Sequence, residues 1–170
     1  MRIFKDAASA ADILKRGRFD DAPRAAAVRE IVQAVKVRGD EALFAYCEKF
    51  DGSALNAQTV AVSAEEIAAA YKEVDEKLLT SLKKAVKNVY EYHARSLMKE
   101  DVRTVNGRTT GYAVRPVQRA GIYVPGGTAP LVSSVLMGVL PAKAAGVAEI
   151  YVCTPAKNGK GSPAVIVAAA

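Results

Sequence analysis

A proline and two glycines end a short apolar run in the second half of the chain. The run "AGIYV" at 120–124 leads directly into Pro125-Gly126-Gly127-Thr128, and a new apolar segment begins at Leu131. Glycine lets a ligand approach the backbone closely, and the first amides of a following helix attract anions. The segment could therefore cradle a phosphate or another anionic group, or it could be a tight turn that binds nothing.

Tyr123 stands close to this turn, with one residue between it and Pro125. Its ring could stack on the planar ring of a ligand, or it could pack as an ordinary strand residue. The turn is not the Gly-x-Gly-x-x-Gly fingerprint of dinucleotide-binding folds, nor a Walker loop, which needs a Lys-Ser or Lys-Thr pair. Residue types alone leave both interpretations open.

Other residues with catalytic or metal-binding chemistry are isolated. His93 is the only histidine, and it has no partners at the spacing of a metal site. Ser133 and Ser134 have no base near them, so we expect them in the first turns of a helix rather than in a nucleophilic site. Cys47 and Cys153 are far apart and are predicted to be small core residues. The sequence thus contains no complete catalytic or metal site.

The first hundred residues are predicted to be helical. Apolar residues recur there at helical spacing, between residues that commonly start and stop helices. Ser63 and Glu66 have the Ser-x-x-Glu spacing of a capping box, in which two backbone amides are satisfied at the start of a helix. The predicted helices cover 21–39, 40–52, 62–74 and 75 to about 98.

The pattern changes to strands after residue 100. Asn106-Gly107, between residues rich in Val and Thr, predicts an antiparallel hairpin at 101–117 that Pro116 would end. A strand–helix–strand pattern follows and predicts a parallel pair with a right-handed crossover. Its elements are a strand at 120–124, a helix at 131–146, a strand at 148–155 and a further helix from Pro163. Pro141 is expected to kink the first of these helices or to end its first part.

Two parallel strands form a small sheet with exposed edges. The chain is therefore expected to be the front part of a longer protein, or a truncated one. We expect two regions, a helical region at 1–100 and a region at 101–170 that contains the hairpin and the β-α-β unit.

The composition indicates a globular protein, with 51% hydrophobic and 25% charged residues. The net charge of +6 could suit an anionic partner, but the basic residues are dispersed rather than gathered in the stripe typical of nucleic-acid binding. A basic nucleic-acid binder is therefore the least favoured interpretation. No run approaches the roughly 18 apolar residues of a membrane span, and the N-terminus lacks a signal-peptide core. We expect a soluble, cytoplasmic protein with no nucleic-acid or membrane partner.

The segment "RAGIYVPGGTAPLVSSVLMGVLPAKAAGVAEIYVCTP" at 119–155 resembles the corresponding segment of histidinol dehydrogenases. The shared features are the Gly-Ile-Tyr-Val-Pro-Gly-Gly-Thr-Ala-Pro-Leu run, the Ser-Ser-Val-Leu-Met helix and the Pro-Ala-x-x-Ala-Gly that follows. "GDEAL" and "KFDG" in the helical region are similar too. The resemblance extends over most of the chain.

This resemblance implies an enzyme that oxidises L-histidinol to L-histidine through the aldehyde, with two NAD⁺, at the end of histidine biosynthesis. Family members are homodimers and hold a Zn²⁺ that positions the substrate. The implied fold class is α/β, with a helical N-terminal region followed by a β-hairpin and an incomplete Rossmann-like parallel β-α-β unit.

The resemblance also implies a set of cofactor contacts. Tyr123 matches the family tyrosine that contacts NAD, and by position in the same fold Pro125, Gly126, Gly127 and Pro155 would line the cofactor groove. The zinc ligands and the acid–base pair of the family lie beyond the matched segment. We therefore assign no catalytic and no metal residue to this chain, and we expect the chain alone to be inactive. The alternative is a non-catalytic nucleotide-binding or dimer-partner module of the same fold.

Overall fold

The computed structural model describes residues 22–126, 130–156 and 159–170. The chain divides into two compact units, Met1–Leu43 and Phe44–Ala170. Helix α2 (Ala22–Arg38) belongs to the first unit, and helix α3 (Asp40–Asp51) begins in the first unit and continues into the second. The expected division between residues 100 and 101 stays a prediction.

Helices α4 (Ala64–Glu73) and α5 (Glu76–Arg95) start at residues that cap them. The Ser63 hydroxyl accepts a hydrogen bond from the Glu66 amide at 3.2 Å, and the Glu66 carboxylate accepts one from the Ser63 amide at 2.8 Å. This confirms the predicted capping box. Helix α5 ends a few residues earlier than predicted because Ser96 caps its last turn, donating its hydroxyl to the carbonyl of Tyr92 at 2.9 Å.

Strands β1 (Asp101–Val105) and β2 (Arg108–Tyr112) form the predicted antiparallel hairpin. Asn106 and Gly107 connect them with φ values of 50° and 73°, both in the left-handed region that a type I′ turn requires. The ladder is shorter than the predicted ribbon at 101–117. Because β1 begins at Asp101, which pairs with Tyr112, residues 113–117 have no strand opposite them.

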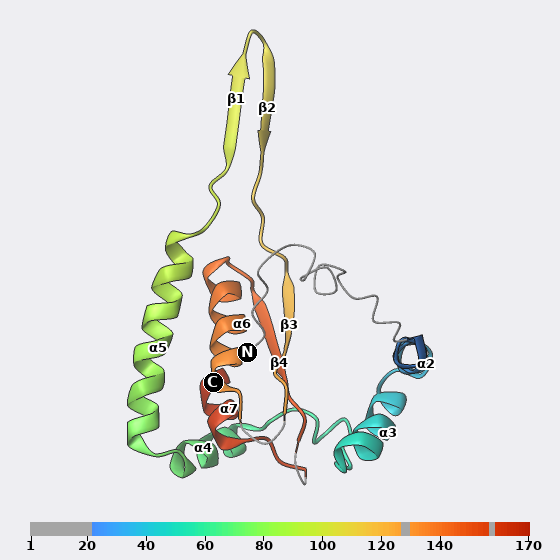
Figure 1. Ribbon diagram of the computed structural model, residues 1–170. Helices are drawn as coiled ribbons and strands as arrows, with labels where there is room; N and C mark the ends of the chain where they lie inside the picture. Colours follow the sequence, from blue (N-terminus) through green and yellow to red (C-terminus); the bar gives the residue numbers. More distant parts are fainter. Residues whose placement is uncertain (1–21, 127–129, 157–158) are drawn as a thin grey trace, which may run out of the picture. The chain divides into compact units, whose positions relative to one another are not determined.

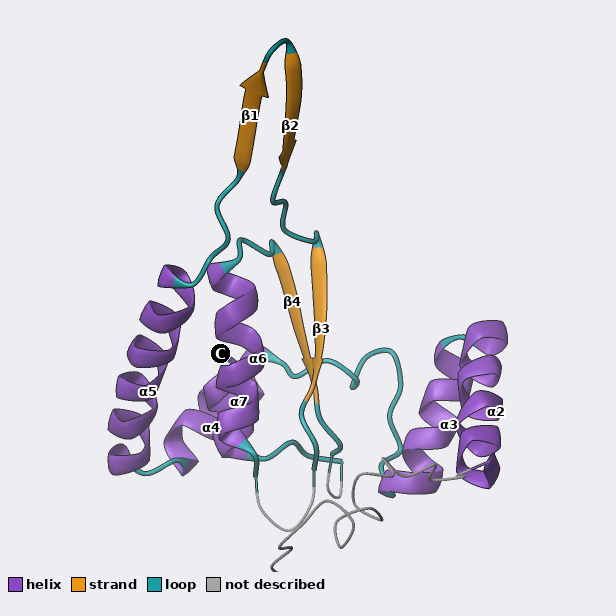
Figure 2. Cartoon of the chain, turned by 45° about the horizontal axis from the view of Figure 1, so that its top comes forward, coloured by secondary structure: helices purple, strands orange, loops and turns teal. Residues whose placement is uncertain are grey.

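Strands β3 (Arg119–Tyr123) and β4 (Glu149–Cys153) pair in parallel. Helix α6 (Val132–Ala144) connects them, and it lies between α5 and the two strands (Figures 1 and 2). The short helix α7 (Pro163–Ala169) follows β4 and packs against α4 and α6. The predicted α/β class and its β-α-β unit are confirmed.

The core of the second unit lies between α6, α7 and one face of the strand pair. Val124, Val135 and Val165 are buried in contact with one another. Successive strand residues point to opposite faces, so Ile122 and Val152 pack on this core whereas Tyr123 and Cys153 do not. The partly buried residues packed around the core are Ile122, Val132, Val139, Val152 and Ala168.

Helix α6 approaches β3 so closely at Gly138 that a larger residue would not fit. A Cβ atom at Gly138 would lie 2.6 Å from Cγ2 of Ile122, well inside the optimal separation of about 3.5–4.0 Å between carbon atoms.

Helix α6 runs without interruption through Pro141. The expectation that Pro141 could end a first part of the helix is therefore wrong, because packing against α5 and the strands holds the helix together despite the missing amide.

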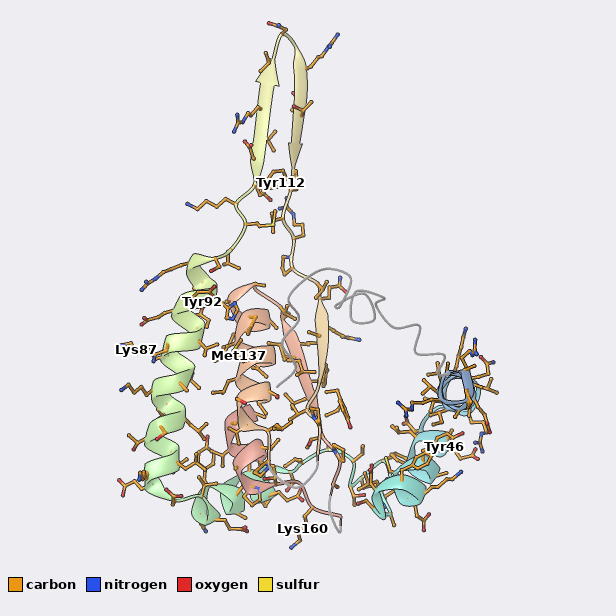
Figure 3. All side chains as sticks on the ribbon, viewed as in Figure 1. Tyr46, Lys87, Tyr92, Tyr112, Met137 and Lys160 are labelled. Carbon is orange, nitrogen blue, oxygen red and sulfur yellow. The ribbon has the colours of Figure 1, made fainter. Side chains whose placement is uncertain are left out.

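The basic residues of α5 form a solvated face. Lys83, Lys84 and Lys87 are exposed, and the Lys87 side chain points away from α6 (Figure 3).

In the described ranges, no helix has the length and apolar character needed to cross a lipid bilayer.

The contact at Gly138 predicts that Gly138→Ala lowers the free energy of unfolding by about 1–3 kcal/mol, as overpacking does in well-packed cores. Urea denaturation of the variant and the parent protein measures this change. Gly121→Ala is the matched control, since no atom lies within 4 Å of a Cβ built at Gly121; its effect should stay within about 0.5 kcal/mol. Equal effects of the two substitutions would contradict the close approach.

Candidate functional site

The candidate site lies where β3 and β4 end. Carboxyl ends of parallel strands meet at one edge of a sheet, where open α/β folds bind ligands. The register places Tyr123 opposite Cys153 as the last pair. One residue further, the Val124 amide donates to the carbonyl of Cys153 at 2.8 Å, and the Val124 side chain is fully buried. The two strands thus remain hydrogen-bonded to each other, and β3 remains packed on the core, up to the turn that begins at Pro125.

Tyr123 presents its ring on the open face of the strand pair. The residue is 66% exposed, because the alternation along β3 turns Ile122 towards α6 and Tyr123 away from it. The ring therefore does not fill the core of the described residues. It is free to contact a ligand at the strand end, and contact with NAD stays a prediction.

The turns after the two strands touch each other. A Cβ atom at Gly126 would lie 3.2 Å from Cβ and Cγ of Pro155, so the absence of a side chain at Gly126 lets the two turns pack. Pro125 and Gly126 are exposed, and Pro155 is half-buried. The structure thus brings Tyr123, Pro125, Gly126 and Pro155 to one edge, which we call the strand-end site. Gly127 lies outside the described residues.

Helix α6 begins near this edge with no side chain capping its first turn. Its N-cap residue is Leu131, which carries no hydrogen-bond acceptor in its side chain. The first amides of a helix lack intrahelical partners, and together with the helix dipole they attract anions. Ser133 and Ser134 lie in this first turn, as predicted, and the Ser134 amide donates to the carbonyl of Leu131 at 3.0 Å.

Ser53 forms hydrogen bonds to residues that follow β4. The sequence alone did not predict a functional or structural role for it. Its hydroxyl donates to the carbonyl of Ala156 at 3.0 Å and accepts from the amide of Gly159 at 3.2 Å. A serine between two predicted helices carries no sequence signal for partners 103 and 106 positions away.

At the amino-terminal ends of the same two strands, away from the strand-end site, polar side chains of β3 and β4 form a network. Nε of Arg119 lies 3.0 Å from Oε2 of Glu149, and the Tyr151 hydroxyl donates to the same oxygen at 2.7 Å. The hydrogen bond from Tyr151, and then the one from Arg119, lowers the pKa of the Glu149 carboxyl. Glu149 in turn raises the pKa of the Tyr151 hydroxyl. Because Arg119 is the register partner of Glu149, this network supports the alignment that places Tyr123 opposite Cys153.

The cysteines and the histidine form no further site. Cys153 is exposed, so the prediction of a core position is wrong for it, because β4 turns it to the open face. Cys47 is half-buried, and burial, followed by the nearby charge of Asp51, raises the pKa of its thiol. His93 is half-buried on α5. Over the described parts of the chain, no three His, Cys, Asp or Glu side chains gather as a metal site would require.

Comparison with known proteins identifies similar chains. A family model described as histidinol dehydrogenase matches residues 14–170. A histidinol dehydrogenase of Caldanaerobacter subterraneus subsp. tengcongensis is 44% identical over 157 residues, which are 92% of this chain and 36% of the relative. One from Carboxydothermus hydrogenoformans is 46% identical over 143 residues, 84% of this chain and 34% of the relative.

A solved structure has the same fold. The crystal structure of histidinol dehydrogenase from Elizabethkingia anophelis matches with a TM-score of 0.76 at 31% sequence identity, and the match covers 99% of this chain and 35% of that one. The chain thus spans about a third of the length of the relatives that it matches.

The polar network predicts that Tyr151→Phe raises the pKa of Glu149 towards its usual range, with Arg119 still holding it partly down. Since the folded-state pKa is lowered, ionised Glu149 favours the folded state above its unfolded pKa of about 4.3. This contribution is lost as the pH falls through the folded-state pKa. NMR titration of the Glu149 carboxyl measures the shift. Tyr112→Phe on the hairpin is the control, and an equal change in both variants would contradict the assignment.

Proposed function

The chain belongs to the histidinol dehydrogenase family, and on this premise we propose that the complete polypeptide containing it oxidises L-histidinol to L-histidine through the aldehyde, reducing two NAD⁺. The family match over residues 14–170 is the observation that carries the proposal, and the names of the relatives support it. The reaction forms the last steps of histidine biosynthesis, in the cytoplasm.

Within that polypeptide, the strand-end site supplies part of the NAD-binding surface. The exposed ring of Tyr123 suits stacking on a planar ring of the cofactor. Pro125 and Gly126 are exposed and leave the backbone approachable, and the uncapped first turn of α6 suits a phosphate. Pro155, which packs against Gly126, belongs to the same surface, and the family resemblance assigns Gly127 to it as well. Bound NAD⁺ supplies the hydride acceptor, and the residues of this chain bind and orient it.

The Zn²⁺ of the complete enzyme is held by residues outside this chain. A catalytic zinc site needs three protein ligands around one ion, and the family resemblance assigns these ligands to polypeptide beyond the matched segment. On that basis we assign no zinc ligand and no catalytic residue to this chain. We also propose that the complete protein is a homodimer, which the family resemblance supports.

Turnover by the complete polypeptide tests this proposal. With L-histidinol, NAD⁺ and Zn²⁺, we expect two NADH for each histidinol consumed, measured by NADH absorbance and by the histidine formed. Residues 1–170 alone should give no turnover, because the zinc and acid–base groups are missing. Binding of NAD⁺ by the complete polypeptide without oxidation of histidinol would instead support a non-catalytic nucleotide-binding module.

A second prediction concerns Tyr123. In the complete polypeptide, Tyr123→Ala should raise the KM for NAD⁺ about 3- to 10-fold, as the loss of one aromatic stacking contact implies. The melting temperature should hardly change, because the ring is exposed. Tyr112→Ala, which removes a ring from the hairpin (Figure 3), should leave this KM unchanged. An unaltered KM together with a large loss of stability would show that Tyr123 is a packing residue.

A further inference from the structure

Ser53 is the one buried polar residue in the parts of the chain that the structure describes, with an exposed fraction of 1%. Burial of a hydroxyl costs free energy unless its hydrogen bonds are satisfied. The Ser53 hydroxyl is satisfied in both directions. Its closer acceptor is the Ala156 carbonyl at 3.0 Å, while the Asp51 carbonyl lies at 3.4 Å, and it accepts from the Gly159 amide at 3.2 Å. The closer acceptor and the donor both follow β4, so this part of the chain provides the better hydrogen bonds of the buried hydroxyl.

The backbone of Ser53 is held as firmly as its side chain. Gly52 follows α3 with a φ of 64°, the left-handed conformation with which helices commonly end. The Gly52 amide donates to the carbonyl of Glu48 at 3.1 Å, and the Ser53 amide donates to that of Cys47 at 3.3 Å. The C-terminal turn of α3 therefore fixes the position from which the Ser53 hydroxyl reaches the loop.

The loop that Ser53 holds is part of the strand-end site. Ala156, whose carbonyl accepts the hydrogen bond, directly follows Pro155. Pro155 in turn packs against Gly126, where an added Cβ would be 3.2 Å away. A continuous path thus leads from the end of α3 through Ser53 and Pro155 to the turn after β3.

We propose that Ser53 is a positioning residue for the strand-end site, whose hydroxyl holds Ala156 and Gly159 and thereby keeps Pro155 at the distance from Gly126 that NAD⁺ binding requires. This inference rests on the proposed function of the site. Ser53 does not touch the cofactor. It acts through Ala156 and Pro155, so its loss changes the affinity for NAD⁺ and leaves the chemical step intact.

The test compares Ser53→Ala with the parent in the complete polypeptide. The variant leaves the Ala156 carbonyl and the Gly159 amide without the hydroxyl. We expect the KM for NAD⁺ to rise about 5- to 30-fold, the equilibrium equivalent of one or two lost hydrogen bonds. The kcat and the KM for L-histidinol should stay within about twofold. Hydrogen exchange, followed by mass spectrometry, should become faster in peptides covering residues 155–162.

Two further variants separate positioning from general stability. Ser53→Thr keeps the hydroxyl and should restore most of the NAD⁺ affinity. Ser81→Ala removes an exposed hydroxyl that donates to the Lys77 carbonyl within α5, and it should leave every kinetic constant unchanged. A Ser53→Ala variant that melts earlier but keeps the parent KM for NAD⁺ would overturn the proposal, because Ser53 would then be a packing residue only.

The exchange measurement distinguishes failure of this inference from failure of the proposed function. If the parent polypeptide neither binds NAD⁺ nor reduces it, the proposed function is wrong, and the role of Ser53 in cofactor binding is wrong with it. Faster exchange at 155–162 would even then show that the hydroxyl holds the loop. If exchange at 155–162 is unchanged by Ser53→Ala in an active enzyme, the positioning role is refuted on its own.

Discussion

Parallel pairing of β3 with β4 is the constraint on which the rest of the second unit depends. The hydrogen bond from the Val124 amide to the carbonyl of Cys153 carries this pairing to the last residue before the turn. Since parallel strands run in the same direction, both following turns must emerge at one edge. The connecting helix α6 must then cross one face, and the other face keeps Tyr123 and Cys153 exposed.

Local chemistry made most elements of the fold predictable from the sequence. Asn106-Gly107 can adopt the two positive φ values of a tight hairpin, and the Ser63–Glu66 pair satisfies helix amides within one turn. Such interactions involve residues only a few positions apart. The strand-end site was predictable to the same extent, because the order of strand, turn and helix is sufficient to place Pro125 and Gly126 at the carboxyl end of a parallel strand.

Features that depend on distant partners were not predictable from the sequence. Gly138 must be small because of Ile122 on another element, and nothing in its neighbours along α6 indicates this contact. The exposure of Cys153 depends on which face of β4 the helix covers. Pro141 persists inside α6 because packing outweighs its missing amide. The role of Ser53 depends on the Gly159 amide, 106 positions further along the chain.

The separation between Ser53 and Gly159 has a consequence for synthesis on the ribosome. Ser53 leaves the ribosome 106 residues ahead of its second partner. At roughly 5–20 residues per second, this is a delay of roughly 5–20 s. Helices α3, α4 and α5 have ample time to form during this interval, since helix formation takes about a microsecond. In the nascent chain the Ser53 hydroxyl therefore lacks its two partners beyond β4 until Ala156 and Gly159 arrive, and closure of this edge belongs to the late, long-range stage of folding.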